Sequence, residues 1–94
     1  MRVSWTQPAA RELEAIGDYI AHENPRAADR TVKRIRERTR ELADYPSLGR
    51  AGRALGTREL VIPRTPFIVV YRVGDDRVEI LTVFHGARRW PESF

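Results

Sequence analysis

The chain has 94 residues, with 17 basic side chains against 13 acidic ones and a formal net charge of +4. This length predicts a single domain over residues 1–94, with residues 84–94 as a C-terminal tail, and excludes two domains. The absence of cysteine excludes a disulfide scaffold, a thiolate metal site and a cysteine nucleophile. No apolar run approaches the roughly 18 residues of a membrane span, and the N-terminus lacks the apolar core of a signal peptide. We therefore expect a soluble, cytoplasmic protein without a membrane partner.

Two helices are predicted in the first half, after a short strand at residues 3–5. Apolar residues recur at helical spacing over residues 8–23, behind Thr6 as a candidate N-cap, and again over residues 25–43. The Asn24-Pro25 pair between them offers an N-cap followed by a proline in the first turn. Because the break is so short, the two helices are predicted to form an antiparallel hairpin.

The second half has the pattern of strands. Residues 45–57 are predicted to be a loop, since glycine and arginine recur in them. Three strands are then predicted at Arg58–Ile62, Phe67–Val73 and Arg77–Phe84, the last two joined by a hairpin turn. Strict alternation in the last strand places Val78, Ile80, Thr82 and Phe84 on one face. The order β-α-α-β-β-β predicts an α+β fold in which the helical hairpin packs on one face of a small antiparallel sheet.

The basic charge is concentrated in the second predicted helix. Residues 26–42 carry seven bases and three acids, a net charge of +4, whereas residues 1–25 carry a net charge of −2. Two interpretations stay open for this segment. It is either a solvated helix face or a surface for an acidic partner, which could be nucleic acid or protein.

Few residues could support catalysis. His85 follows the last strand, close to Arg88 and Arg89, and a histidine there could exchange protons near neutral pH. Cleavage of RNA without a metal needs a base, an acid and a cation, which His85 or Glu59 and one of these arginines could supply. Any basic domain would contain as much, so spacing alone does not favour an enzyme. His22 lies far from His85 in a chain without cysteine, so we expect no metal site and no cofactor.

The order of the motifs carries information that periodicity does not. A first strand leads into Ala9-Ala10-x-x-Leu13-x-x-Ile16, and Tyr45-Pro46-x-x-Gly49 follows the helical hairpin. The second half contains RELVI at 58–62, FIVVYRV at 67–73 and VEILTVFHGARRWP at 78–91. Over nearly the whole chain this set resembles the RelE/ParE superfamily of bacterial toxins from type II toxin–antitoxin systems, which includes plasmid-stabilisation proteins. The resemblance implies a RelE/ParE-like fold.

Two activities are known in that superfamily, and the resemblance allows a comparison residue by residue. RelE-like members cut messenger RNA in the ribosomal A site without a metal, whereas ParE-like members inhibit DNA gyrase. The ribonucleases place two lysines where this chain has Glu59 and Val61, and an arginine where it has Ile68. Their second arginine is matched by Arg88, but their terminal tyrosine is replaced by Phe94. One match in five implies the ParE-like branch.

The resemblance therefore implies a toxin that poisons gyrase by binding it and that a cognate antitoxin neutralises, with DNA contacted only through the antitoxin. Target contacts are expected at Arg88, Arg89 and Trp90. The antitoxin is expected to lay a helix and an extended segment along the hairpin and the sheet. Its acidic residues are expected to meet Arg30, Arg34, Arg38, Arg50 and Arg53.

Two alternatives stay open. The first is a ribosome-dependent messenger RNA endoribonuclease that uses Arg88 together with His85 or Glu59. The second is an inactive module that only binds the antitoxin.

Overall fold

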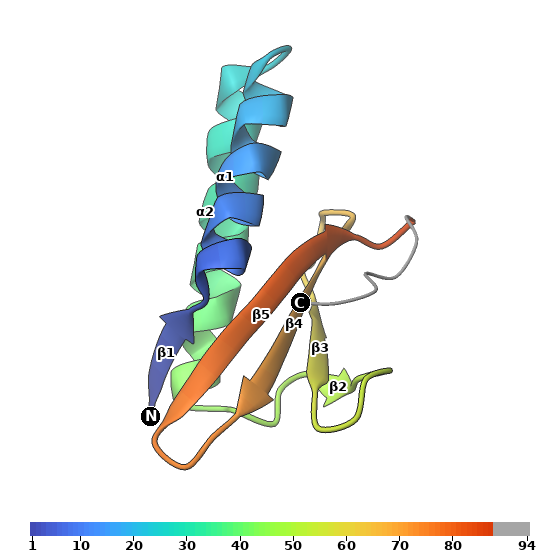
Figure 1. The fold of residues 1–94 in the computed structure, drawn as a ribbon. Helices are drawn as coiled ribbons and strands as arrows, with labels where there is room; N and C mark the ends of the chain where they lie inside the picture. The colour runs from blue at the N-terminus through green and yellow to red at the C-terminus, as the bar shows by residue number, and fades with distance from the viewer. Residues whose placement is uncertain (88–94) are drawn as a thin grey trace.

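The structure, a computed structural model, describes residues 1–87, in which a helical hairpin leans against a five-stranded sheet (Figure 1). The predicted α+β order is confirmed. The strands are β1 (Arg2–Trp5), β2 (Arg50–Ala51), β3 (Arg58–Val61), β4 (Phe67–Val73) and β5 (Arg77–His85). The helices are α1 (Gln7–Ala21), α2 (Pro25–Arg40) and the 3-10 helix η1 (Glu41–Ala43), which continues from α2.

Both long helices begin at the polar caps that the sequence predicts. The Thr6 hydroxyl accepts a hydrogen bond from the Ala9 amide at 3.3 Å, and Asn24 Oδ1 accepts one from the Ala27 amide at 3.1 Å. Each cap satisfies an amide that has no partner inside the helix, so it fixes where the helix starts. Within residues 1–87, neither helix is long and apolar enough to cross a bilayer.

The sheet has the strand order β1-β5-β4-β3-β2 and is mixed rather than wholly antiparallel. The pairs β3–β4 and β4–β5 are antiparallel as predicted, but β1 runs parallel to β5, with Val3 opposite Val78. A parallel pair needs a long connection, and the chain between these two strands provides one. The predicted loop also contains β2, which pairs antiparallel with β3. A strand of two residues has no alternating apolar pattern, so the sequence does not reveal it.

A β-bulge interrupts the pairing of β4 with β5. Val70 lies opposite Thr82 and Tyr71 lies opposite Ile80, so Leu81 is an extra residue without a partner in β4. Such an insertion moves the side chains after it to the other face of the sheet.

Because of the bulge, Phe84 lies on the face of the sheet opposite to the predicted one. Val78 and Ile80 pack in the core beneath the helices, and beyond the bulge Val83 joins them. Phe84 instead packs with Ile68 on the opposite side of the sheet, together with Val70 and Leu81. The predicted placement of Phe84 with Val78 and Ile80 was therefore wrong, because strict alternation ignores the inserted residue. We call this second side, which faces away from the helical hairpin, the distal face.

The start of α1 is tied to the edge of β5 beyond the end of β1. The Thr6 amide donates to the Ile80 carbonyl at 3.1 Å. Six residues later, the Glu12 carboxylate accepts hydrogen bonds from the Thr82 hydroxyl at 2.8 Å and from the Val83 amide at 3.4 Å. These contacts satisfy an otherwise free strand edge and fix how the hairpin sits on the sheet.

The main core lies between the helices and the sheet. Its helical side consists of Ala9, Leu13, Ile35 and Leu42, and its sheet side of Leu60, Ile62, Phe67, Val69, Tyr71, Val78, Ile80 and Val83. The buried helical residues recur at the spacing that the sequence predicts. Burial of this apolar surface is the main term that holds the hairpin against the sheet.

Tyr71 connects the core to the segment after η1. Its hydroxyl donates to the Pro46 carbonyl at 2.7 Å and accepts from the Gly49 amide at 2.8 Å. A Cβ at Gly49 would lie 2.7 Å from the Tyr71 ring, so only glycine allows this approach. Burial raises the pKa of the Tyr71 phenol, although the Gly49 amide and Arg58 oppose the effect.

We predict that Tyr71→Phe destabilises the protein by about 1–3 kcal/mol, because it leaves the Pro46 carbonyl and the Gly49 amide without a partner. The raised pKa stabilises the wild type fully below the unfolded-state value of about 10, and this contribution is lost as the pH rises through the folded-state value. Urea unfolding between pH 7 and 11 measures both effects. The stability of the wild type should fall more steeply above pH 10 than that of Tyr71→Phe, and equal stability at pH 7 would contradict the role of the hydroxyl.

Candidate functional site

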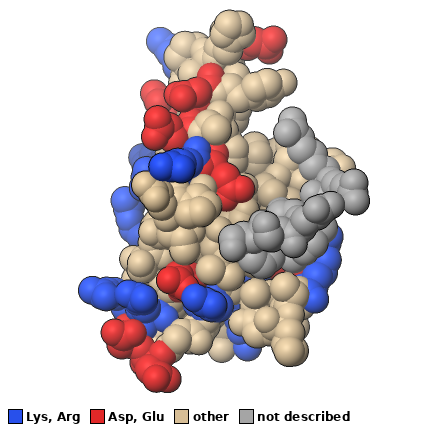
Figure 2. Space-filling model, viewed as in Figure 1, with Lys and Arg blue, Asp and Glu red and all other residues tan. Residues whose placement is uncertain are grey.

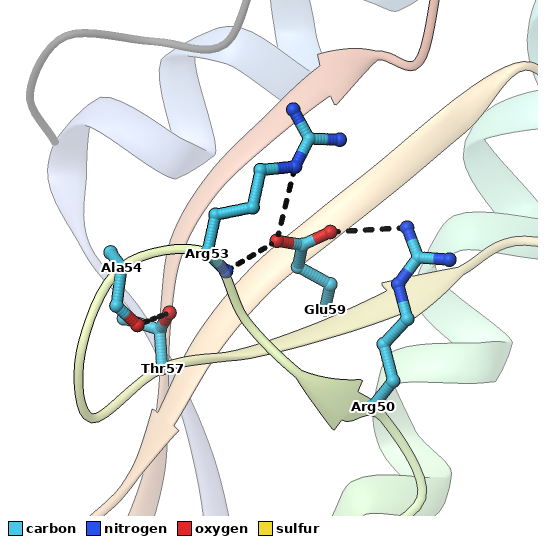
Figure 3. A network of polar contacts seen from close by, with 5 residues as sticks. All are labelled: Arg50, Arg53, Ala54, Thr57 and Glu59. Atoms are coloured by element: carbon cyan, nitrogen blue, oxygen red, sulfur yellow. Dashed lines mark hydrogen bonds and ion pairs between the residues drawn. The ribbon is translucent and has the colours of Figure 1, made fainter.

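Glu59 is the most enclosed charged side chain on the distal face. It lies opposite Val70 in the β3–β4 register, and its side chain is 2% exposed. One carboxylate oxygen accepts from Arg50 Nη2 at 3.1 Å, and the other accepts from the Arg53 amide at 2.9 Å and lies 3.7 Å from Arg53 Nε (Figure 3). We call these three residues the Glu59 clamp. Because both carboxylate oxygens are engaged, the clamp holds β2 and the following loop against β3.

The positions compared with RelE-like ribonucleases share one face of the sheet. Val61 pairs with Ile68 and Glu59 pairs with Val70, so side-chain alternation places Glu59, Val61 and Ile68 together on the distal face. Where the resemblance implies three cations for an RNA phosphate, this chain presents one clamped carboxylate and two apolar side chains. The guanidinium groups that border it, those of Arg50 and Arg53, are already paired with the Glu59 carboxylate, which reduces the positive charge available to a pentavalent phosphorane.

His85 lies on the other side of the sheet. It is the register partner of Phe67, a core residue beneath the helices, and the two rings meet edge to face with centroids 5.7 Å apart. The Ala87 amide donates to His85 Nδ1 at 3.1 Å. A ring nitrogen that accepts a hydrogen bond carries no proton, so the proton of the neutral ring is on Nε2.

Glu59 and His85 are therefore not brought together. They belong to β3 and β5, which are separated by β4, and they point to opposite faces of the sheet. Two groups in this arrangement cannot act on one phosphate as base and acid, because each must lie within hydrogen-bond reach of the reacting atoms. Among residues 1–87 there is also no group of three His, Asp or Glu side chains that could hold a metal ion.

A groove opens between the helical hairpin and the end of the sheet. Its volume is about 540 Å³, and we call it the hairpin groove. Its lining is mainly apolar and comes from both helices, the β3–β4 connection and the end of β5: Ala15, Ile16, Tyr19, Ile20, Thr31, Arg64, Thr65, Pro66, Phe67 and His85. Tyr19 on its rim is 77% exposed. An apolar lining of this kind suits the apolar side of a helix or of an extended segment.

The five arginines predicted for the antitoxin separate into two groups. Arg30, Arg34 and Arg38 follow one flank of α2 at intervals of four residues, and Arg38 pairs with Glu41 at 2.9 Å. Arg50 and Arg53 belong to the Glu59 clamp, and their contact with an antitoxin stays a prediction. In Figure 2 acidic side chains gather over the upper part of the hairpin, and basic ones border them and gather again lower down.

Four residues named in the sequence analysis fall outside the described residues. Arg88, Arg89 and Trp90, the predicted target contacts, belong to residues 88–94, as does Phe94. Their role stays a prediction.

Sequence reasoning missed two features of the surface. The first is the ion pairing of Glu59, which the sequence analysis considers only as a candidate proton carrier. Its position next to the arginines of the 50–58 segment is the signal that could have suggested an ion pair. The second is Leu55, whose side chain is fully exposed in the loop that the clamp holds. A single leucine in a polar loop gives no periodic signal.

Comparisons of the sequence with known proteins agree on a family. Residues 3–90 match the model of the ParE toxin of the type II toxin–antitoxin system parDE. The putative toxin Y4kP of Sinorhizobium fredii is 48% identical over 97% of this chain and 94% of its own length. The toxin RelE2 of Caulobacter vibrioides is 38% identical over 93% of this chain and 97% of its own length.

Solved structures agree with the sequence relatives. A chain of the chromosomal ParDE system from P. aeruginosa superposes with a TM-score of 0.82 at 31% identity, covering 90% of this chain and 95% of that one. A chain of the RelBE2 toxin–antitoxin complex from Mycobacterium tuberculosis gives a TM-score of 0.57 at 26% identity, covering 93% and 92%. The chain therefore belongs to the RelE/ParE superfamily of type II toxin–antitoxin toxins, with its family match in the ParE branch.

Proposed function

We propose that this toxin arrests growth by binding DNA gyrase in the cytoplasm, without chemistry of its own, and that a cognate antitoxin neutralises it. The observation that carries the proposal is the composition of the distal face. Glu59, Val61 and Ile68 stand where RNA cleavage would need cations, and Glu59 is fully engaged by the clamp. The opposed positions of Glu59 and His85 add support, as does the match to the ParE toxin model.

The antitoxin is proposed to occupy the hairpin groove and the arginine flank of α2. The groove offers an apolar surface beside the helices, and Arg30, Arg34 and Arg38 offer positive charge along one side of them. The related ParDE and RelBE2 structures come from toxin–antitoxin systems, which supports a partner of this kind. An acidic antitoxin that places an apolar face in the groove would satisfy both features.

Expression of the toxin alone tests the target. We expect filamentous cells and a DNA-damage response with intact messenger RNA, and His85→Ala should keep this activity within about twofold. Loss of a general acid or base would instead lower activity by about 10²–10⁴-fold. RNA sequencing of 5′ ends together with cell imaging distinguishes the two. Codon-specific cuts in translated messages that disappear in His85→Ala would refute gyrase as the target.

Reversal of charge on α2 tests the antitoxin surface. The double variant Arg30→Glu/Arg34→Glu should weaken antitoxin binding about tenfold at low salt, and the difference should shrink as salt rises, because Arg30 is exposed and Arg34 is partly exposed to solvent. Lys33→Glu/Arg36→Glu is the matched control, since it reverses two charges elsewhere on the same helix. Titration calorimetry at two salt concentrations measures the effect. Equal losses in the two double variants would contradict a specific surface at Arg30 and Arg34.

A further inference from the structure

Leu55 is more exposed than any other large apolar side chain that the structure describes. Its exposed fraction is 102%, against 77% for Tyr19, the next in order. It lies in the loop that joins β2 to β3, with Ala54 before it and Gly56 after it. Isolated exposed leucines are common on protein surfaces, so exposure alone assigns no role.

The loop around Leu55 is held in one shape by its own contacts. The Gly52 amide donates to the Thr57 carbonyl at 2.8 Å, and the Thr57 hydroxyl donates to the Ala54 carbonyl at 2.6 Å (Figure 3). Gly56 has a φ of +77°, a conformation that favours glycine. The loop is thus closed at its base and turned at its tip, without help from a partner.

The Glu59 clamp attaches this closed loop to the sheet. The Arg53 amide and guanidinium both meet the carboxylate, so the residue two positions before Leu55 is fixed to β3. The carboxylate is 2% exposed, whereas the arginine side chains are more than half exposed. A rigid loop that presents one apolar side chain has little conformational entropy to lose when it binds.

Charge around the loop favours a protein partner over nucleic acid. Arg50 and Arg53 already pair with Glu59, and Arg58 Nη1 donates to the Gly49 carbonyl at 2.8 Å. Guanidinium groups engaged in this way are less available to bind phosphates. The segment nevertheless has more basic than acidic side chains, so its net charge is positive. Transfer of a leucine side chain from water into an apolar pocket is favourable in free energy.

The loop is also separate from the surface proposed for the antitoxin. It precedes β3, whereas the turn that lines the hairpin groove follows β3, so the two lie at opposite ends of that strand (Figure 1). A partner confined to the groove would therefore leave the loop accessible to another protein.

We propose that the 52–57 loop is a contact site for the toxin's protein target, with Leu55 entering an apolar pocket that is bordered by carboxylates. Glu59 acts through the loop as a positioning residue. This inference rests on the proposed function, since it assigns a surface to the target that the toxin binds.

Leu55→Asp tests the contact, and Tyr45→Asp serves as its control, because Tyr45 is a second exposed apolar residue, 65% exposed, outside the loop. Each variant is expressed alone at matched levels, and antitoxin affinity and melting temperature are measured on purified protein. We expect Leu55→Asp to reduce growth arrest and gyrase binding tenfold or more, as for a hot spot, with unchanged melting temperature and antitoxin affinity. Tyr45→Asp should remain toxic.

Three results would overturn the inference. In the first, Leu55→Asp is as toxic as the wild type. In the second, it loses antitoxin affinity, which would assign the loop to the antitoxin. In the third, the wild type is not toxic, which removes the proposed function and the inference together, whereas the first two results leave the proposed function standing.

Glu59→Gln separates positioning from contact. Glutamine keeps an acceptor for the Arg53 amide but removes the ion pairs, so the loop should loosen while Leu55 is retained. We expect faster hydrogen exchange at the amides of residues 52–57 and a smaller loss of gyrase binding than in Leu55→Asp. Wild-type exchange combined with lost binding would contradict a positioning role.

Discussion

The burial of β4 on both of its faces is the constraint on which the rest of the structure depends. Phe67, Val69 and Tyr71 point into the core beneath the helices, while Ile68 and Val70 point to the distal face. Since β4 is the central strand, its register with β3 and β5 decides which face each neighbouring side chain occupies. The bulge at Leu81 completes the arrangement, because it turns Phe84 to the distal face and leaves His85 opposite Phe67.

This constraint explains why the surface is suited to binding. The register with β4 places the carboxylate of Glu59 on the distal face, and the bulge sends the imidazole of His85 to the other, so no acid–base pair is assembled from them. The deeply buried carboxylate of Glu59 holds a loop against the sheet, and the hairpin groove has a mainly apolar lining. A small toxin with these surfaces can act by occupying larger proteins, and the arrangement keeps a groove and a rigid loop at opposite ends of β3.

Much of the fold could be predicted from the sequence, because it depends on local signals. Thr6 and Asn24 mark the helix starts, and the apolar run at Phe67–Val73 marks the central strand. The parallel pairing of β1, the two-residue β2 and the bulge at Leu81 could not be predicted, since each depends on contacts between distant segments. For the same reason the sequence marks Glu59 as a residue of interest but does not reveal its ion pairs with Arg50 and Arg53, because these partners are visible only in three dimensions.

The claim that this toxin works by binding gyrase can be measured with purified components. The toxin is incubated with gyrase, plasmid DNA and ATP, and cleaved DNA is measured after protein denaturation. In a parallel reaction it is added to a translating extract with a labelled message. If the toxin acts on gyrase, linear DNA accumulates in proportion to toxin while the message stays intact. A message cut at codon intervals, with no cleaved DNA in the gyrase reaction, would contradict that claim.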